Sequence, residues 1–269
     1  MCPIFKAGEK ITFSNYRPIS ILPSFSKVYE KAISNRLLSF FESKNILKDN
    51  QYGFRSKRST YMAILDMYNK ISLAIDSGKF SVGIFLDLSK AFDTLNHNIL
   101  LKKLEHYGIR GTLLNWFKSY LQDRQQFVYL NGACSSSKPI YFGVPQGSIL
   151  GPLLFIIYIN DVTHSSKILN FILFADDTNL FHCDDSITNL ILVLNRELQH
   201  ISDWFKANKL SLNASKSNFI VFGNKRVPNN IALDINIDGF ALERSTHIKF
   251  LGVFFLTKNM ESTYKSYIW

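Results

Sequence analysis

The 269-residue sequence predicts an α+β protein with an antiparallel sheet. Helical and strand-like patterns interleave along the chain, and several predicted strands are joined by hairpins, which connect antiparallel neighbours. Hydrophobic residues make up 46% of the chain and charged residues 19%, which is typical of a globular protein with a sizeable core. The length fits one or two domains.

The first half of the chain begins with two short strands around a polar turn, within residues 3–23. Apolar residues at helical spacing then predict a helix over 24–47 and another over 61–78, which ends at a glycine suited to a C-cap. An apolar strand over 79–88 comes next. A helical pattern over 90–108 follows and also ends at a glycine.

The second half continues the alternation of helices and strands. The predicted helices are 113–123, 148–162 and 187–210, of which the second is apolar enough to be buried. The predicted strands are a hairpin over 125–144 that turns at Asn131-Gly132, a hairpin within 170–183, and two late strands over 216–223 and 247–256.

The charge balance is basic, with 31 Lys and Arg against 21 Asp and Glu and a formal charge of +10. Such a balance favours polyanionic partners, nucleic acid before membrane surfaces. The three isolated cysteines indicate reduced thiols. The N-terminus has no apolar signal segment, and the longest apolar run, 149–159, is shorter than the roughly 18 residues of a membrane span. We therefore expect an intracellular protein, nuclear or cytoplasmic, without a membrane partner.

Two adjacent acids, Asp176 and Asp177, lie between apolar runs at the tip of a predicted hairpin. Adjacent carboxylates repel each other, and apolar flanks make their ionisation harder. A divalent cation such as Mg²⁺ would offset this repulsion. Asp87, which ends another apolar strand, is the best candidate for a third ligand of a two-metal site. The alternatives are a solvated turn for the pair and a helix N-cap for Asp87.

Several ordered motifs carry a resemblance to a known family. They are "YRPISILPSFSKVYEKAISNRL", "QYGFRSKRST", "FLDLSKAFDTLNH", "FGVPQGSILGPLLF", "FADD" and "LSLNASKSNFIVF … HIKFLGVFF". In this order and spacing, the chain from residue 3 to about 255 resembles the reverse transcriptase of a non-LTR (LINE-type) retrotransposon of the broad jockey-like kind.

The resemblance implies a right-hand polymerase without its thumb. Residues 1–80 would form the fingers with part of the palm base, residues 81–256 the palm with an antiparallel sheet, and residues 257–269 the truncated start of the thumb connection. The resemblance implies an RNA-directed DNA polymerase that adds dNTPs to a primer 3′-OH by two-metal phosphoryl transfer. Asp87, Asp176 and Asp177 would hold two Mg²⁺ ions, for which Mn²⁺ can substitute. The expected partners are an RNA template, a DNA primer or target, and dNTPs; which proteins bind this chain is left open.

The resemblance also assigns residues around the incoming nucleotide. Phe92 matches a steric gate that would exclude a ribose 2′-OH, although core packing at a helix start is the alternative. Gln146 and Gly147 match the segment lining the nucleotide. Lys6 and Arg17 match the positions that grip the triphosphate, and Arg suits this because its guanidinium can bind phosphate bidentately.

Further residues are assigned to the template and primer or to proton transfer. Arg55 and Arg58, with Lys57 between them, could follow template phosphates. Gly143 and Pro145 match the template side of the nucleotide segment, and Lys216 aligns with a lysine proposed as the general acid for pyrophosphate. The alternative for Gly143 and Pro145 is an ordinary turn, and the alternative for Lys216 is an exposed lysine before a strand.

Three interpretations of the function stay open. The first is the RNA-directed DNA polymerase domain, as a truncated copy. The second is a catalytically silent retrotransposon remnant that binds nucleic acid. The third is an RNA-dependent RNA polymerase with the same palm, against which Phe92 and the "FADD" motif speak.

Overall fold

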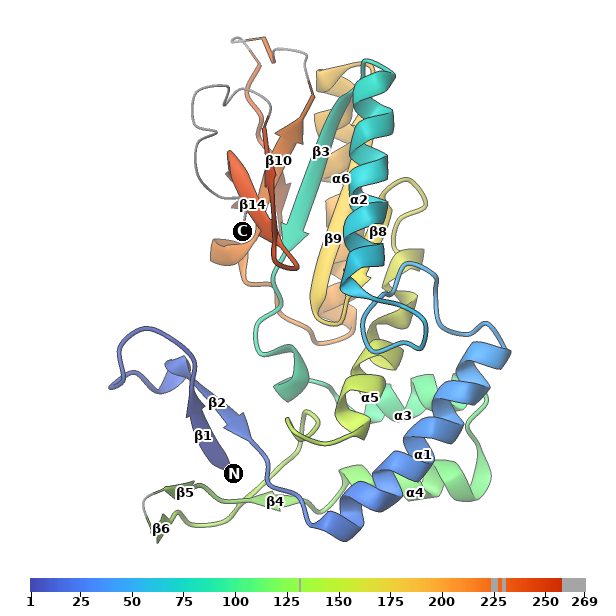
Figure 1. The fold of residues 1–269 in the computed structure, drawn as a ribbon, viewed down its shortest axis with the longest axis vertical. Helices are drawn as coiled ribbons and strands as arrows, with labels where there is room; N and C mark the ends of the chain where they lie inside the picture. Colours follow the sequence, from blue (N-terminus) through green and yellow to red (C-terminus); the bar gives the residue numbers. More distant parts are fainter. Residues whose placement is uncertain (131, 224–226, 229–230, 258–269) are drawn as a thin grey trace. The chain divides into compact units, whose positions relative to one another are not determined.

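The computed structural model describes residues 1–130, 132–223, 227–228 and 231–257 (Figure 1). The predicted turn residue Asn131 and residues 258–269 of the predicted thumb connection lie outside this part of the chain. The chain divides into two compact units that interleave in sequence. Unit 1 comprises residues 1–48, 90–160 and 208–210, and unit 2 comprises 49–89, 161–207 and 211–269. The assignment of 1–80, 81–256 and 257–269 to fingers, palm and thumb connection stays a prediction.

Unit 1 is built mainly from helices. They are α1 (Ser24–Ser43), α3 (His97–His106), α4 (Gly111–Leu121) and α5 (Leu150–Ile159). Nine of the ten residues of α5 are buried, and α1 and α3 both pack against it. A helix that is apolar on every side must be surrounded, so α5 forms the centre of this unit, as its sequence predicts.

The remainder of unit 1 consists of short antiparallel pairs. The predicted N-terminal strands are present as β1 (Cys2–Phe5) and β2 (Tyr16–Ile19). The predicted hairpin over 125–144 is divided into two small ribbons, β4 (Gln125–Gln126) with β7 (Lys138–Pro139), and β5 (Tyr129–Leu130) with β6 (Ala133–Cys134).

The start of α5 is held by a buried carboxylate from α1. Glu30, which is 1% exposed, accepts hydrogen bonds from the backbone N–H groups of Ile149 at 2.7 Å and Leu150 at 3.4 Å. The Tyr120 hydroxyl donates to the same carboxylate at 3.1 Å. The first N–H groups of a helix lack partners within the helix, and a carboxylate there also interacts favourably with the helix dipole. Glu30 therefore fastens α1 and α4 to the start of α5.

Unit 2 contains a five-stranded sheet in the order β13-β10-β3-β9-β8. Its strands are β3 (Phe80–Leu86), β8 (Asn170–Phe174), β9 (Asp177–Asp184), β10 (Asn218–Phe222) and β13 (Glu243–Arg244). All neighbours are antiparallel except β10 and β13. The predicted antiparallel sheet is thus confirmed, with one short parallel strand at its edge.

Two helices cover the sheet from opposite sides: α2 (Thr60–Asp76) and α6 (Ile187–Ala207) (Figure 1). The face toward α2 is a continuous apolar cluster that includes Met67 and Ile71 from the helix and Ile172, Phe181 and Ile220 from three strands. Side chains of a strand alternate between its two faces, which is why one sheet can bury apolar residues against both helices.

The structure differs from two of the predicted elements. The helix predicted over 90–108 is interrupted, because Ala91–Asp93 form a 3₁₀ turn and α3 begins only at His97, after an Asn96 side chain that accepts from Ile99 N–H at 3.1 Å. The single strand predicted over 247–256 is instead a hairpin of β14 (His247–Phe250) and β15 (Val253–Leu256). Gly252 at its tip has a φ of 95°, a conformation favourable for glycine.

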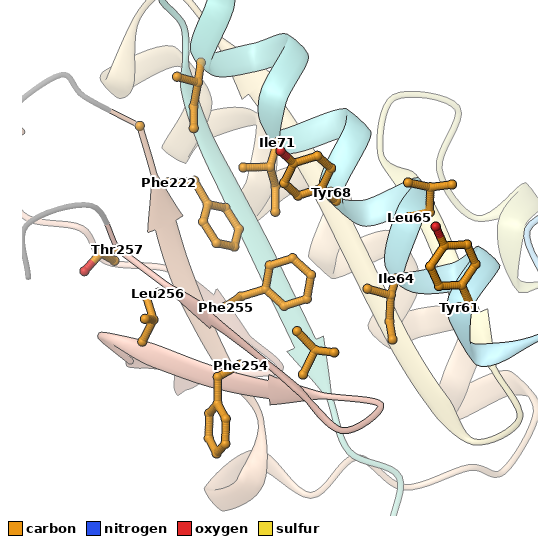
Figure 2. A pocket seen from close by; sticks show the side chains of 13 residues that line it. Tyr61, Ile64, Leu65, Tyr68, Ile71, Phe222, Phe254, Phe255, Leu256 and Thr257 are labelled. Carbon is orange, nitrogen blue, oxygen red and sulfur yellow. The ribbon is translucent and has the colours of Figure 1, made fainter. Parts of the chain in front are cut away.

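An apolar pocket of about 520 Å³ lies between α2 and the β14–β15 hairpin (Figure 2). Its lining includes Tyr61, Ile64, Leu65, Tyr68 and Ile71 from α2, Phe222 from β10, Phe254, Phe255 and Leu256 from β15, and Thr257, which follows β15. Several of these side chains are exposed, among them Tyr61 and Phe254. Within the described residues, no helix combines the length and apolar character that crossing a membrane requires.

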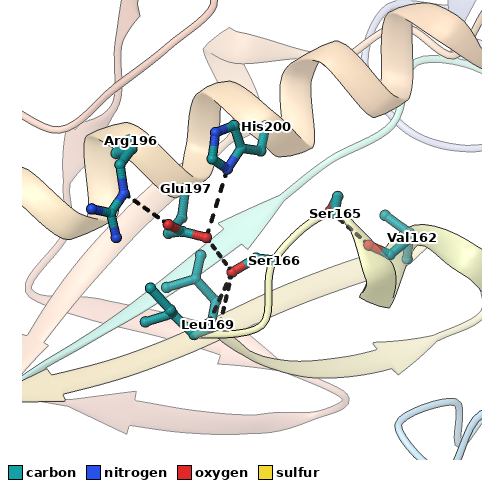
Figure 3. A network of polar contacts seen from close by, with 8 residues as sticks. Val162, Ser165, Ser166, Leu169, Arg196, Glu197 and His200 are labelled. Carbon is teal, nitrogen blue, oxygen red and sulfur yellow. Dashed lines mark hydrogen bonds and ion pairs between the residues drawn. The ribbon is translucent and has the colours of Figure 1, made fainter.

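The loop before β8 is attached to α6 by a polar network (Figure 3). The buried Glu197 accepts from the Ser166 hydroxyl at 2.7 Å and from Arg196 Nε at 3.0 Å. Ser166 Oγ in turn accepts from Leu169 N–H at 3.1 Å. Burial of Glu197 opposes its ionisation, but the hydrogen bonds from Ser166 and Arg196 outweigh burial, so its pKa lies below the ordinary value of 4.5.

We predict that Glu197→Gln lowers the free energy of unfolding by about 1–3 kcal/mol at pH 7, because it removes a charged acceptor from a buried network. A carboxylate with a lowered folded-state pKa stabilises the fold above its ordinary pKa, and this contribution is lost as the pH falls through the folded-state value. The difference in free energy of unfolding between the parent and the Glu197→Gln variant should therefore shrink below about pH 4.5. Urea unfolding at several pH values measures it. Asp203→Asn, on the exposed side of α6, is the control and should change stability by less than about 0.5 kcal/mol.

Candidate active site

The hairpin that carries Asp176 and Asp177 is formed by β8 and β9. Phe174 pairs with Asp177, so Ala175 and Asp176 form a two-residue turn. Ala175 has a φ of 55°, in the left-handed region that favours glycine. For an alanine this conformation costs on the order of 1–3 kcal/mol and persists only where neighbouring contacts impose it. The two acids thus follow directly on a strained position.

Asp87 reaches the same end of the sheet on the neighbouring strand. The register pairs Leu86 of β3 with Thr178 of β9, and Asp87 directly follows the end of β3. The Asp87 N–H donates to Ser217 Oγ at 3.1 Å, and its carbonyl oxygen accepts from Asn213 N–H at 2.8 Å. The predicted meeting of Asp87 with the Asp176–Asp177 hairpin is therefore present. Ser217 and Asn213, which sequence reasoning missed, hold the backbone of Asp87 in place.

The surroundings at this end of the sheet disfavour the ionisation of Asp177. Partial burial, followed by the charges of Asp176 and Asp87, raises the pKa of Asp177 to about 6. Part of the Asp177 residue remains exposed to solvent, so its carboxylate is crowded by neighbouring groups without being enclosed. A bound cation would reverse the balance, because it favours the ionised form of each acid.

A cavity of about 300 Å³ opens beside these acids. Asp87, Asp177 and Lys216 line it together, so three of the predicted site residues share one cavity. The other polar lining residues are Asn179, two residues after Asp177; Asn218, two residues after Lys216; and His247 and Lys249 from a later strand. Sequence reasoning missed these four; His247 and Lys249 in particular are remote from the acids in sequence. The cavity combines hard oxygen ligands with cationic side chains, which suits a phosphate-bearing substrate and a divalent ion.

The acids fit a divalent cation by chemistry, although their side chains are not yet gathered around one point. Among the described residues, no group of three or more His, Cys, Asp or Glu side chains is arranged closely enough to hold a metal ion. Burial raises the pKa of Asp177 most, and the nearby charges of Asp176 and Asp87 raise it further, so these two acids lie within electrostatic reach of Asp177.

Two of the residues predicted near the nucleotide lie in unit 1 and are held by local contacts. The half-buried ring of Phe92 packs on Phe155, with ring centroids 4.8 Å apart, so the packing role that the sequence left open is real. Gln146 donates from Nε2 to the Asp93 carboxylate at 2.9 Å. Asp93 thereby orients the side chain of Gln146.

Glycines permit close backbone approaches in the same segment. A Cβ on Gly143, whose φ is 81°, would lie 2.6–2.8 Å from backbone atoms of Asp93. A Cβ on Gly147, whose φ is 101°, would lie 2.9 Å from the carbonyl oxygen of Ser20. The carbonyl oxygen of Pro145 accepts from the hydroxyl of Ser148 at 2.8 Å. The glycines at 143 and 147 thus satisfy a packing requirement, as their residue type suggested.

The predicted cations differ in their surroundings. Arg17 lies on β2 opposite Ile4, and Lys6 follows β1; both side chains are exposed. Arg58 forms an ion pair with Asp49, at 2.6 Å between Nη2 and Oδ1. Arg55 is half-buried, whereas Lys57 is exposed. Asp49 therefore engages part of the Arg58 guanidinium.

Solved structures share the fold of this chain. The structure of apo telomerase from Candida tropicalis truncated from its C-terminal domain matches with a TM-score of 0.56 and 13% identity, over 86% of this chain and 44% of that one. An insertion-loop deletion mutant of the RNA-dependent RNA polymerase of a human picorbirnavirus matches with a TM-score of 0.50 and 14% identity, over 77% and 38%. The fold is therefore that of the fingers and palm of right-hand polymerases. The described residues, which end at Thr257, include no thumb.

Sequence comparison shows which family of right-hand polymerases the chain belongs to. The chain belongs to the reverse transcriptase (RNA-dependent DNA polymerase) family, whose model matches residues 4–255. A probable RNA-directed DNA polymerase from transposon BS of Drosophila melanogaster is 31% identical over 89% of this chain and 27% of that protein. An RNA-directed DNA polymerase from the mobile element jockey of the same species is 31% identical over 93% and 28%. The chain thus spans less than a third of the length of these relatives, and the predicted kinship with jockey-like elements is confirmed.

We predict that Asp177→Asn stabilises the metal-free protein at pH 7. A carboxyl whose folded-state pKa is raised contributes stability below its ordinary pKa of 3.8, and that contribution is lost as the pH rises through about 6. Asparagine does not ionise, so the variant does not lose this stability as the pH rises. Because the residue is partly exposed, screening limits the gain to about 1 kcal/mol or less. Thermal unfolding in EDTA between pH 3 and 8 should show the gap opening between about pH 4 and pH 6.

Asp184, at the other end of β9, provides a control with the opposite sign. Hydrogen bonds from Ser186 N–H at 2.8 Å and Asn189 Nδ2 at 2.6 Å favour its ionised form, and its pKa lies below the ordinary value. Asp184→Asn should therefore destabilise at pH 7. A destabilising effect of Asp177→Asn in EDTA would contradict the picture of mutually repelling carboxylates.

Proposed function

We propose that this chain is the polymerase domain of a non-LTR retrotransposon reverse transcriptase, which extends a DNA primer with dNTPs along an RNA template. The observation that carries the proposal is the placement of Asp87 beside the Asp176–Asp177 turn, at the edge of a cavity that Lys216 also lines. Membership of the reverse transcriptase family supports this chemistry over other uses of the same acids.

Asp87, Asp176 and Asp177 would hold the divalent ions, Mg²⁺ with Mn²⁺ as an alternative, in a two-ion site. Such ions, when bound, supply positive charge that activates the primer 3′-hydroxyl and stabilises the leaving pyrophosphate. The acids differ in what they contribute. Asp87 is anchored through its backbone by Ser217 and Asn213, whereas Asp176 and Asp177 are presented by a tight turn.

Phosphoryl transfer depends mainly on positioning and charge stabilisation, so the protein needs few groups for acid–base chemistry. Lys216 can supply one of them. Its residue is exposed and lines the cavity that contains Asp87 and Asp177. An ammonium group there would hold a proton for the departing pyrophosphate and offset its charge.

Grip on the triphosphate would come from Lys6 and Arg17 of the β1–β2 hairpin. Both are exposed, and the paired strands give the hairpin a defined register. Gln146 would contact the base or template without adding charge, since Asp93 accepts one N–H of its amide and the amide has a second N–H and an oxygen. Gly143, Pro145 and Gly147 would form the backbone surface beside it.

Binding of the template and primer would be mainly electrostatic. The chain carries a formal charge of +10, and Arg55, Lys57 and Arg58 cluster in one loop of unit 2. Contacts of this kind release counterions, so affinity should fall steeply as salt rises. The partners proposed are therefore an RNA template and a DNA primer or target.

We predict that the purified chain extends a DNA primer annealed to RNA when Mg²⁺ and dNTPs are supplied, and that Asp87→Asn or Asp176→Asn lowers the rate by about 100-fold or more. The loss follows from removal of a charged oxygen ligand. Primer extension resolved on a gel measures the rate, and Asp184→Asn, at the far end of β9, is the control and should keep most of the activity.

Two results would contradict the proposal. One is unchanged extension in the Asp87 and Asp176 variants. The other is binding of RNA–DNA duplex by the parent chain without any extension in Mg²⁺ or Mn²⁺, which would favour a catalytically silent remnant.

We predict that Phe92→Ala raises incorporation of rNTPs relative to dNTPs by about 10-fold or more, while dNTP use falls less, because the ring would no longer clash with a 2′-hydroxyl. Single-nucleotide incorporation with matched dNTP and rNTP measures the ratio. Phe155→Leu removes the same ring contact from the other side and is the control. An equal change in both variants would mean that Phe92 acts only through packing.

A further inference from the structure

A short segment ahead of α2 runs along the free edge of β8, the strand that leads to the two acids. Gln51 forms a parallel bridge with Leu173. Leu173 N–H donates to the carbonyl oxygen of Asn50 at 2.8 Å, and Tyr52 N–H donates to that of Leu173 at 2.8 Å. The Asn50 side chain donates to the carbonyl oxygen of Phe171 at 2.9 Å. Residues 50–53, which we call the edge segment, thus fix the end of β8.

The side chain of Gln51 extends this contact to the turn itself. Its Oε1 accepts from Ala175 N–H at 3.1 Å and from Gly53 N–H at 2.8 Å. Gln51 is 1% exposed, and its Nε2 has no hydrogen-bond partner in the described part of the chain. A buried amide with an unpaired donor is unfavourable. Gln51 therefore acts through its side-chain oxygen, which accepts a hydrogen bond from Ala175, the residue before Asp176.

Gly53 packs against the same residue. A Cβ built on Gly53 would lie 2.4 Å from Ala175 N and 3.1 Å from the carbonyl carbon of Phe174. These are backbone atoms, which cannot rotate out of the way as a side chain can. The backbone of Gly53 is not left-handed, so the absent side chain is the only reason that this position requires glycine.

These contacts converge on Ala175, whose φ of 55° is unfavourable for alanine. A residue in that conformation needs neighbours that impose it. In the edge segment, Gln51 accepts a hydrogen bond from the Ala175 N–H, and Gly53 packs against the Ala175 backbone. Asp176 and Asp177 are the next two residues of the chain.

We infer that Gln51 and Gly53 are positioning residues that hold the Ala175–Asp176 turn and thereby set where the two carboxylates lie. The consequence for catalysis rests on the proposed function; the consequence for the turn does not. The same contacts also cover the edge of the sheet. The tests must therefore distinguish positioning of the turn from stabilisation of the sheet alone.

The first test uses metal-free protein and follows hydrogen exchange of the amides in residues 171–180. Gln51→Met keeps the length of the side chain and removes the acceptor, and Gly53→Ala adds the single methyl group that would meet Ala175. We expect Gln51→Met to accelerate exchange at Ala175 about fivefold, the factor that corresponds to one lost hydrogen bond. Gly53→Ala should accelerate it at least as much.

Gly83→Ala is the matched control. Gly83 lies on β3 of the same sheet, is not left-handed either, and its added Cβ would meet the Phe222 ring at 2.9 Å instead of the turn. It should lower the melting temperature without local acceleration at Ala175. If Gln51→Met and Gly53→Ala lower the melting temperature but leave exchange at Ala175 unchanged, the edge segment only stabilises the sheet and the inference is wrong.

The second test asks whether the turn sets the carboxylates. Mn²⁺ binding, followed by electron paramagnetic resonance of the free ion, should weaken by about 10-fold in both variants, as expected when support for metal ligands is lost. In primer extension, kcat should fall about 100-fold while the KM for dNTP changes little, because a small misplacement of reacting groups is costly. Faster exchange at Ala175 with unchanged Mn²⁺ affinity and kcat would overturn the positioning role.

Failure of the proposed function would look different. If the parent chain neither binds Mn²⁺ nor extends primers, the catalytic assignment is wrong. The exchange comparison still decides whether Gln51 and Gly53 hold the turn.

Discussion

The pairing of β3 with β9 is the constraint on which the candidate site depends. It sets Leu86 opposite Thr178 and so brings Asp87 to the end of the sheet where the Asp176–Asp177 turn lies. A slip of one residue would turn every side chain of a strand to the other face. Apolar residues on both faces oppose such a slip, because α2 and α6 cover the sheet from opposite sides. Burial of the core therefore specifies the register, and the register specifies the site.

The site itself is held against local preferences. Ala175 adopts a conformation suited to glycine, and Asp177 has a pKa raised to about 6 by partial burial and by Asp176 and Asp87. Both features cost stability, and functional sites commonly carry such costs. The fold offsets them with contacts from outside the hairpin, in which Asn213 and Ser217 hold Asp87 and the edge segment holds the turn.

Unit 1 uses one buried carboxylate in a similar way. Glu30 satisfies the N-terminal N–H groups of Ile149 and Leu150, directly after the segment that contains Gly143, Pro145, Gln146 and Gly147. A buried charge is tolerable only when it is well hydrogen-bonded, and this one has several donors. The segment proposed to face the nucleotide is therefore fixed at its end by the helix that follows it.

The sequence by itself determined the kinds of element, the apolar character of α5, the presence of acids at strand ends and the family, since these follow from residue type and short-range periodicity. It could not decide that 247–256 is a hairpin, that α3 starts only at His97, or that Phe92 packs on Phe155. Nor could it single out Glu30, which caps a helix 119 residues away, or Gln51, which holds a turn 124 residues away. Such contacts leave no local pattern, because only chain folding brings the donor and the acceptor together.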